Sequence, residues 1–368
     1  MNRISLPIIF VLLASITFSQ KIVTTVVDDP ATLFTDDIIM DASGNLFCAD
    51  YSGDAVFKRT PSGVVTEFVS GLNTPNGLAF NSQGNLYVCD NVGNRIYILN
   101  SAGVQLDTIV TGQPSGIIKD IASDTMIFTT YGSQGSLKKL APDGFVSDFH
   151  IGAPLNGPVG LEYSQGNLYV ANFTDREIYR VEPDTLVFIA QLPVSGYLGF
   201  LGEMDGYLLA TAFNGHKIYR IDPNTGDVNI YAGSTFGATD GALDSAKFKT
   251  PNGIFATTSG DTIYVSEYNT GNLRMITGFT LGLNSLTAEI KVHIYPNPAS
   301  DRITISIKDA LEIDKIRLVD ITGKPLKTIN TEAKETVKLD ISHLTRGQYL
   351  IHFLQEGTFV CSKSILVE

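Results

Sequence analysis

The sequence predicts an all-β protein made of a six-bladed β-propeller and a small C-terminal β-sandwich. A Gly-Asn turn followed by an apolar strand recurs about every 40 residues through most of the chain. A run of short alternating strands fills the remainder. The 368 residues are enough for two or three domains of roughly 100–200 residues each. We therefore expect a leader at 1–19, a propeller at 20–282, a linker at 283–291 and a sandwich at 292–368.

The first residues have the three-part pattern of a secretory signal peptide. Arg3 precedes an apolar run from Leu6 to Phe18, and Thr17 and Ser19 are small residues at positions −3 and −1 of a cut before Gln20. The run is too short to span a bilayer, which takes about 20 residues. We expect export into the periplasm and no transmembrane segment.

The repeat occurs six times. Its units begin at Gly44, Gly84, Asp124, Gly166, Gly206 and Asp261, at spacings of 40, 40, 42, 40 and 55 residues. Each unit holds strand-forming runs bounded by Gly, Asn and Asp, which indicates an antiparallel meander. Four strands in about 40 residues make one propeller blade.

The ends of the repeat region predict how the ring closes. The last unit, from Pro251 to Gly278, supplies three strands and no convincing fourth. An orphan strand, residues 21–27, reads like the fourth strand of the other units. If the last blade receives this strand, the ring closes and exposed sheet edges disappear.

The C-terminal part begins with Tyr295-Pro296-Asn297-Pro298, where two prolines favour an extended segment and forbid a helix. Apolar residues then alternate from Ile303 to Ile307. Further strands are expected at residues 315–320, 337–341, 347–354 and 359–366, with a turn at 321–324. Short strands over so few residues suggest a small sandwich.

Charge and cysteine content exclude some classes of function. The net charge is −12, and the acidic excess lies before residue 292, because the last 77 residues balance their charges. A nucleic-acid-binding protein would need clustered Lys and Arg, so we expect no nucleic acid partner. Cys48 and Cys89 fall in corresponding strands of neighbouring repeats, which would lie about 10 Å apart, so we expect buried thiols and no disulfide.

The first part resembles the NHL-repeat propellers and, more loosely, the gluconolactonase and regucalcin-like six-bladed family. The resemblance rests on residues 75–78 (Pro-Asn-Gly-Leu), 84–88 (Gly-Asn-Leu-Tyr-Val) and 94–97 (Asn-Arg-Ile-Tyr). A further NHL-like stretch, residues 232–254, explains the longest spacing. The resemblance implies the fold and says little about activity, because propellers host unrelated functions.

The C-terminal part resembles the sorting domain of type IX secretion cargo from Bacteroidetes. Four motifs occur in order, at residues 295–298, 320–324, 339–344 and 347–350. The resemblance implies that residues 292–368 engage the type IX secretion machinery and that the protein is secreted or held at the cell surface. The alternative is an ordinary adhesive sandwich module.

A propeller's ligand site usually lies at its axis, where the innermost strands converge. The repeat aligns one residue per unit to face this channel: Asp36, Asn76, Ser115, Val159, Leu198 and Asn252. The gluconolactonase-like resemblance implies a divalent metal at such positions, and oxygen ligands suit Ca²⁺. The metal site would then comprise Asp36, Asn76, Ser115 and Asn252. The alternative is that Asn before Gly is a turn residue that tolerates unusual backbone angles.

Other polar residues of the propeller give little sign of catalysis. His150 and His216 are its two histidines, and neither falls at an inner position, so a Ser-His-Asp triad or a zinc site has little support. Asp50, Asp90, Asn172 and Glu267 end second strands, where they would accept hydrogen bonds from the next turn or line one mouth of the channel. Asp240 and Asp244 lack the ligand spacing of an EF-hand.

The sequence leaves two functions open. The first is an exported binding module for a small molecule, a glycan or a protein. The second is a calcium-dependent lactonase or esterase resembling the gluconolactonase family, in which the metal polarises a carbonyl oxygen beside Asp36, Asn76 and Asn252. The chain has no Trp, the commonest stacking platform for sugars, although Tyr and Phe could take that role.

Overall fold

The computed structural model describes residues 21–257, 260–278, 291–308, 313, 315–320, 325–331, 336–355 and 358–368. The predicted signal peptide, residues 1–19, and residues 283–290 of the predicted linker lie outside them. No described segment forms a helix with the length and apolar character needed to cross a membrane.

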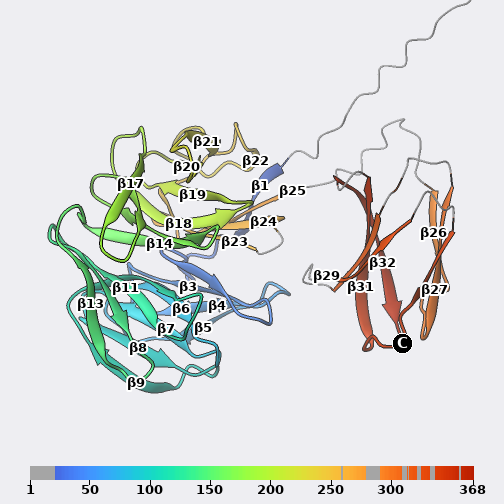
Figure 1. The fold of residues 1–368 in the computed structure, drawn as a ribbon, viewed down its shortest axis with the longest axis horizontal. Helices are drawn as coiled ribbons and strands as arrows, with labels where there is room; N and C mark the ends of the chain where they lie inside the picture. Colours follow the sequence, from blue (N-terminus) through green and yellow to red (C-terminus); the bar gives the residue numbers. More distant parts are fainter. Residues whose placement is uncertain are drawn as a thin grey trace, which may run out of the picture.

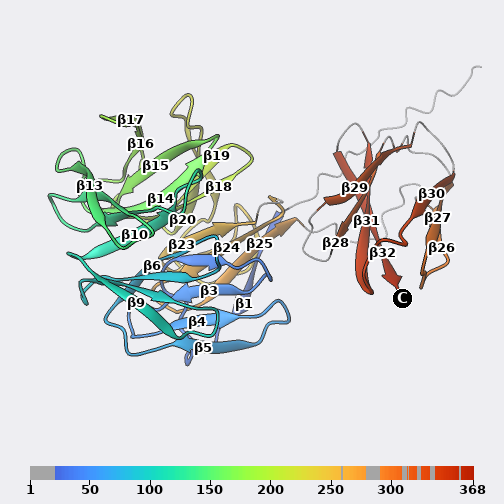
Figure 2. The same ribbon diagram turned by 60° about the horizontal axis from the view of Figure 1, so that its bottom comes forward.

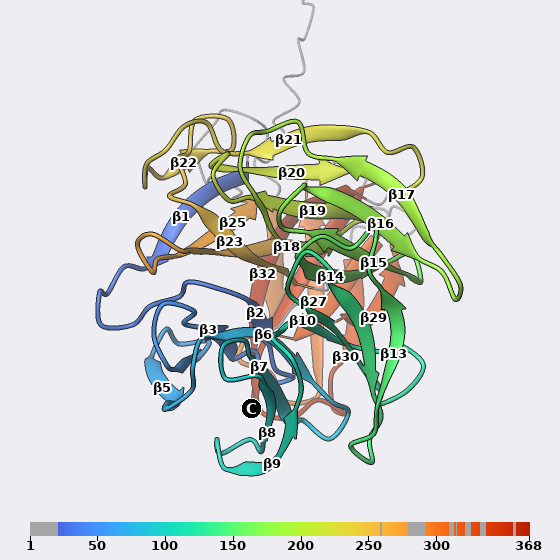
Figure 3. The same cartoon turned by 90° about the vertical axis from the view of Figure 1, so that its left-hand side faces the viewer.

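Between residues 21 and 278 the described strands form six antiparallel sheets arranged around a common centre (Figures 1 and 3). Blades one to three are β2 (Ile38–Met40), β3 (Leu46–Ala49), β4 (Val56–Arg59), β5 (Val65–Val69); β6 (Pro75–Phe80), β7 (Leu86–Asp90), β8 (Arg95–Leu99), β9 (Gln105–Val110); and β10 (Pro114–Lys119), β11 (Met126–Thr130), β12 (Ser136–Leu140), β13 (Val146–Ile151). Blades four to six are β14 (Pro158–Ser164), β15 (Asn167–Asn172), β16 (Glu177–Val181), β17 (Leu186–Gln191); β18 (Leu198–Met204), β19 (Tyr207–Ala212), β20 (Lys217–Ile221), β21 (Val228–Ala232); and β23 (Pro251–Ala256), β24 (Thr262–Glu267), β25 (Leu273–Gly278) with β1 (Lys21–Val27) and β22 (Gly241–Ala242). The predicted six-bladed propeller is confirmed.

The innermost strands β2, β6, β10, β14, β18 and β23 contact one another in sequence around the ring. Their close approach depends on glycine: a Cβ on Gly116 would lie 1.7 Å from the carbonyl oxygen of Val159 in the next blade. Blade one departs from this pattern, because Asp37 stands where the other blades have glycine. Its Oδ2 accepts a hydrogen bond from the backbone N–H of Leu78 in blade two, at 2.8 Å.

The second strands are buried because neighbouring blades cover both faces of each sheet. All five residues of β7 are buried. Apolar clusters form between blades, as where Phe47 and Val56 of blade one pack with Leu78 and Val88 of blade two. Cys48 and Cys89 are buried free thiols, as predicted, and the side chain of Cys361 lies outside the description.

The N-terminal strand closes the ring. β1 pairs with β25 in antiparallel register, for example Ile22 with Thr277, and so supplies the fourth strand of blade six. This confirms the predicted closure. The two-residue strand β22, which the sequence did not predict, lies on the outer side of β1.

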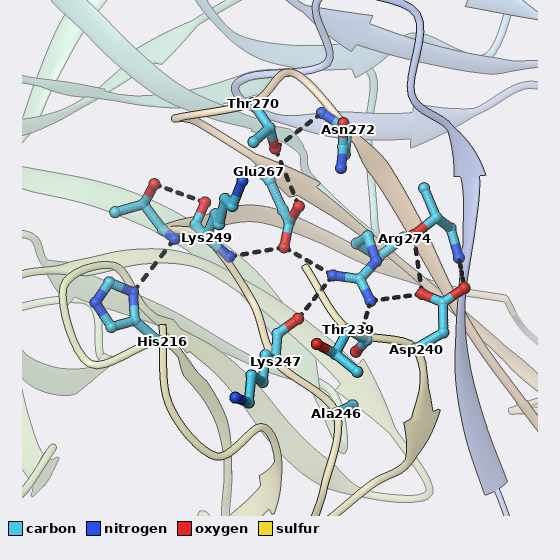
Figure 4. Close-up of polar contacts among 12 residues, drawn as sticks. His216, Thr239, Asp240, Ala246, Lys247, Lys249, Glu267, Thr270, Asn272 and Arg274 are labelled. Carbon is cyan, nitrogen blue, oxygen red and sulfur yellow. Dashed lines mark hydrogen bonds and ion pairs between the residues drawn. The ribbon is translucent and has the colours of Figure 1, made fainter. Parts of the chain in front are cut away.

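A buried ion-pair cluster fastens this closure (Figure 4). Arg274 is 0% exposed, and its Nη1 donates to Glu267 Oε1 at 2.9 Å while its Nη2 donates to Asp240 Oδ1 at 2.8 Å. Nη1 and Nη2 also donate to the carbonyl oxygens of Lys247 and Thr239. Asp240 in turn accepts from the backbone and side chain of Thr25 in β1. We call Arg274, Glu267 and Asp240 the clasp, because it joins the NHL-like stretch, blade six and the N-terminal strand.

The C-terminal part is a sandwich of two sheets (Figure 2). One sheet comprises β26 (Lys291–Tyr295), β27 (Arg302–Lys308) and β30 (Thr336–Asp340); the other has the order β29 (Pro325–Asn330), β28 (Lys315–Asp320), β31 (Gly347–Gln355), β32 (Thr358–Val367). A single apolar core joins the sheets, with Ile305 from one and Ile316 and Phe353 from the other. The sequence missed β26 and β29, and Lys291 begins a strand although we assigned it to the linker. The predicted turn at 321–324 lies outside the described residues.

Candidate functional site

A cavity of about 260 Å³ lies where the innermost strands converge. All six blades contribute to its lining: Asp36, Tyr51, Asn76, Asn91, Ser115, Tyr131, Val159, Phe173, Phe200, Phe213, Asn252 and Tyr268. Five of the six residues that the repeat assigned to the channel are among them. Leu198 is not, because it packs in the apolar cluster between blades four and five, and Phe200 lines the cavity two residues later.

Four polar residues of the lining, Asp36, Asn76, Ser115 and Asn252, form what we call the polar floor. Asp36, its one carboxyl group, is 2% exposed. Asn252 Nδ2 donates to Asp36 Oδ1 at 2.9 Å and to the carbonyl oxygen of Thr35 at 3.0 Å. Burial, and next the neighbouring carboxyl of Asp37, raise the pKa of Asp36 well above its usual range. No ion pair to Asp36 is present among the described residues, so its charged form has no cationic partner within the protein.

Two other polar atoms of the floor are unpartnered. Asn76 is 6% exposed and Ser115 is 0% exposed, and neither Asn76 Oδ1 nor Ser115 Oγ has a hydrogen-bond partner among the described residues. Buried polar atoms are nearly always hydrogen-bonded, because leaving one unpaired costs about 1–3 kcal/mol. These two atoms therefore mark a place prepared for a ligand or an ordered water.

The four residues predicted to hold calcium lie together, but their donor set does not fit that ion well. Ca²⁺ takes about 6–8 oxygen ligands, several of them charged. Asp36 supplies the one charge, and Asn252 turns its amide nitrogen, not its oxygen, toward Asp36. No group of three His, Cys, Asp or Glu side chains suited to a metal occurs in the described part of the chain. The residues present therefore do not fit a calcium ion well enough to assign it a catalytic role.

The alternative explanation of these asparagines, an unusual backbone angle, is wrong. Neither Asn76 nor Asn252 has a positive φ. The left-handed residues lie two positions earlier, at Thr74 (φ 63°) and Thr250 (φ 53°). Backbone conformation therefore does not explain why asparagine occupies these two positions, and their side chains line the cavity.

Five aromatic side chains, Tyr51, Tyr268, Phe213, Phe173 and Tyr131, line the cavity from adjacent blades, and we call them the aromatic arc. Neighbouring ring centroids are 6.3, 5.2, 5.7 and 6.4 Å apart in that order. Successive rings are inclined by 54, 53, 64 and 70°. These angles are close to the rotation of about 60° between blades of a sixfold ring. The rings therefore form a curved wall, which Asn91 interrupts in blade two.

The sequence contained a signal for the aromatic arc that our reading missed. Each member lies seven positions after the start of its repeat unit. This position comes one or two residues after the end of the second strand of the blade. An alignment of the six units by period would have shown an aromatic residue there in five of them. The polar residues that we predicted at the ends of the second strands lie one position earlier.

Those polar residues have structural roles. Asp50 accepts from Thr35 Oγ1 at 3.1 Å, and Asp90 Oδ1 accepts from the backbone N–H groups of Asn73 and Gly93. Glu267 belongs to the clasp, and Asn172 donates to the carbonyl oxygen of Pro154. The clasp also accounts for Asp240, whereas Asp244 is exposed.

Neither histidine of the propeller lines the cavity. His150 Nε2 contacts the carbonyl oxygen of Glu182 at 2.9 Å, and His216 Nδ1 accepts from the backbone N–H of Thr250 at 3.3 Å. Burial lowers the pKa of His216. The expectation that no histidine occupies an inner position is confirmed for both.

Two further carboxyls of the innermost segments lie outside the cavity lining. Burial raises the pKa of Asp37 to about 7 and that of Glu162 to about 8. For Glu162, the nearby carboxyls of Glu203 and Asp37 add to the effect of burial. Both groups therefore titrate close to neutral pH.

Two family descriptions match the chain. Residues 72–99 match the NHL repeat, and residues 293–368 match the secretion system C-terminal sorting domain. The protein is thus an NHL-like propeller with a type IX sorting domain at its C-terminus, which implies secretion to the cell surface or the exterior. No curated protein matches the sequence of this chain.

Solved structures share the fold at low sequence identity. They include a virginiamycin B lyase from Staphylococcus aureus (18% identity, 65% of this chain and 79% of that chain, TM-score 0.51). A gluconolactonase from Xanthomonas campestris is 16% identical over 69% of this chain and 89% of that chain, with a TM-score of 0.55. An auxiliary nutrient binding protein from Bacteroides thetaiotaomicron is 14% identical over 70% of this chain and 76% of that chain, with a TM-score of 0.60. At such identities these likenesses show the propeller fold alone.

Proposed function

We propose that this NHL-like propeller is an exported binding module that holds a small organic ligand in its axial cavity without transforming it. The observation that carries the proposal is the cavity's lining: an aromatic arc borders the same cavity as polar residues, and among the described residues Asn76 Oδ1 and Ser115 Oγ have no hydrogen-bond partner. Binding sites typically combine an apolar wall with a few convergent polar groups. A volume of about 260 Å³ lies just below the range of drug-sized pockets, so the ligand is small.

The lining gives little support for a reaction. Among the described residues that line the cavity, Asp36 and three tyrosines are the titratable groups. General acid–base catalysis usually places a second titratable group near the reacting atom, and nucleophilic catalysis adds a base beside the nucleophile. Neither pairing is present around Ser115, whose Oγ has no hydrogen-bond partner.

The second candidate function is the calcium-dependent lactonase or esterase. The structural likeness to a gluconolactonase and the two unpartnered oxygens beside Asp36 favour it. The single negative charge of the floor weighs against it. In this candidate the bound ion would supply Lewis-acid polarisation of a carbonyl oxygen, and Asp36, Asn76 and Ser115 would hold the ion.

One experiment separates the two functions. The purified full-length chain is melted with a panel of neutral sugars, lactones, organic amines and carboxylic acids, each with and without Ca²⁺, and hits are titrated by calorimetry. The binding module predicts a calcium-independent ligand that is lost in Ser115→Val, a variant of similar volume without the hydroxyl. Saturable Ca²⁺ binding that Asp36→Ala abolishes, together with hydrolysis of δ-gluconolactone, would establish the hydrolase instead.

The route to the exterior is a separate proposal. Residues 292–368 would engage the type IX machinery after the signal peptide has directed the chain to the periplasm. A chain truncated after residue 291 should then fold as a propeller but accumulate in the periplasm. Its appearance in the medium at the level of the full-length chain would refute this route.

A further inference from the structure

The cavity offers one buried carboxyl group and no positive charge. Asp36 lies at its floor, and no Lys, Arg or His is among the described residues of the lining. An anionic ligand would therefore be desolvated without a counter-charge, which is costly. The acidic excess of the propeller adds a long-range field that attracts cations.

Asp36 is a buried carboxyl group that has no cationic partner among the described residues. It is nearly fully buried, Asp37 and Asp50 lie close enough to disfavour its ionised form, and its side-chain partner is the neutral amide of Asn252. Glu267, by contrast, has Arg274 at 2.9 Å, and the buried carboxylates of Asp50 and Asp90 accept hydrogen bonds from neutral donors. A cation that enters the cavity would supply what the protein omits at Asp36.

The aromatic arc provides the second half of a cation site. The face of an aromatic ring is negative, and a cation within about 6 Å of a ring centroid is attracted by about 0.5–2 kcal/mol per ring. Tyr51 lies near enough to Asp36 for the carboxyl to raise the pKa of its phenol, after burial. The arc and the carboxylate thus border one small space, and the cation's remaining surface would contact apolar side chains such as Val159 and Phe200.

We propose that the ligand of the axial cavity is an organic cation whose methylated or quaternary ammonium group sits between the aromatic arc and Asp36, with a short hydroxylated or amide tail toward Asn76 and Ser115. The proposal rests on the binding function proposed above and names its ligand class. A compact metal ion would leave the arc without a role, and a neutral sugar would give the Asp36 carboxyl no cation to favour its ionised form. A quaternary ammonium uses both, because its methyl groups pack on the rings while its charge faces the carboxylate.

The test compares two molecules of nearly the same shape. Choline chloride and its uncharged isostere 3,3-dimethyl-1-butanol are titrated into the full-length chain by calorimetry, with sodium chloride as the ionic-strength control. Tetramethylammonium chloride serves as the head group without a tail. We expect choline to bind saturably, and the uncharged isostere to bind at least about thirtyfold more weakly, since truncating one side of a buried charge pair costs about 2 kcal/mol or more.

Amino-acid substitutions in the lining test whether the cation binds within the cavity. Asp36→Asn keeps the volume and the hydrogen bond with Asn252 and should weaken choline binding by about tenfold or more. Tyr131→Leu and Phe213→Leu keep an apolar side chain and should each cost roughly two- to thirtyfold, the range of one cation–π contact. Phe188→Leu is the control, because Phe188 is 54% exposed on the outer strand β17 and far from the lining. Melting curves confirm that each variant is folded.

The outcomes distinguish this inference from the function on which it rests. Equal binding of choline and its isostere would overturn the cationic ligand and leave an uncharged ligand in the same cavity. Choline binding that persists in Asp36→Asn and in both arc variants would overturn it by placing the cation elsewhere. If no cation binds while the panel yields a neutral ligand lost in Ser115→Val, the inference fails and the binding module stands. If the panel yields nothing, both fail.

Discussion

Two buried carboxyl groups in neighbouring blades, Glu267 and Asp36, have different surroundings. Glu267 lies in the clasp, where Arg274, the backbone N–H of Lys249 and the hydroxyl of Thr270 all donate to it. Asp36 lies in the axial cavity with the amide of Asn252 as its side-chain donor. Burial raises the pKa of both groups, but at Glu267 a guanidinium opposes that rise, and at Asp36 two further carboxyls reinforce it.

The difference indicates which of the two is built for stability. A buried ion pair supported by further hydrogen bonds holds elements together, and removal of one partner leaves an uncompensated buried charge. A buried acid without a cation contributes less to stability, and where it lines a cavity it is a candidate for ligand binding. The following predictions test that distinction, from the largest expected effect to the smallest.

Removal of the clasp cation should have the largest effect. Arg274→Met leaves Glu267 unpaired in the interior and releases Asp240, so the free energy of unfolding should fall by about 3–5 kcal/mol. Urea unfolding monitored by circular dichroism measures this change. Arg220→Met is the matched control, because Arg220 is exposed and its contact with the Tyr207 ring should matter by no more than about 1 kcal/mol. Equal losses in the two variants would contradict the role of the clasp.

The pH dependence of stability should come next. The folded-state pKa values of Asp37 and Glu162, about 7 and about 8, exceed those of the unfolded chain, so the folded state binds more protons in the range between. Their contribution is fully present below about pH 4 and is lost as pH rises through the folded values. Both side chains are partly exposed, so we expect a decline of about 1–3 kcal/mol between pH 5.5 and 8.5. Urea unfolding at both pH values should show a flatter profile for Asp37→Asn/Glu162→Gln; an unchanged slope would count against this assignment.

Neutralising the cavity acid should matter much less than removing Arg274. Asp36→Asn removes a charge that has no cationic partner and keeps a group able to bond Asn252, so unfolding should change by less than about 1 kcal/mol. The same variant should lose ligand binding. A destabilisation as large as that of Arg274→Met would make Asp36 a structural residue and erase the comparison.

The smallest effect on stability is expected in the aromatic arc. Tyr131 is 41% exposed, so Tyr131→Leu should change the free energy of unfolding by no more than about 0.5 kcal/mol. Thermal melting of the free and ligand-bound protein should nevertheless show a reduced ligand-induced shift in melting temperature. A variant that melts lower when free but keeps the full shift would assign the ring to the fold and not to the site.

The period of the sequence predicted most of the fold and part of the site. Six repeat units and an orphan first strand predicted the blades and the closure by β1, because a blade is a local unit whose strands follow one another. The same period predicted that Asp36, Asn76, Ser115, Val159 and Asn252 face the axis. It failed at Leu198, where Phe200 lines the cavity instead.

Features that depend on distance between remote residues were beyond the sequence. Nothing near Arg274 indicates that it pairs with Asp240, 34 positions earlier, because the path of the NHL-like stretch decides that contact. The unpartnered state of Asn76 Oδ1 likewise depends on what surrounds it in three dimensions. The aromatic arc, in contrast, was readable from the repeat, since its members share one position in the period.

The pairing of β1 with β25 also sets the order in which the molecule can form. Its register joins Ile22 to Thr277, so the first strand must wait until nearly the whole propeller has been synthesised and delivered to the same side of a membrane. Contacts of such long sequence separation form slowly, because the intervening chain must first be brought together. In a chain that crosses a membrane with its N-terminus leading, the ring can therefore be completed only after residue 278 has arrived.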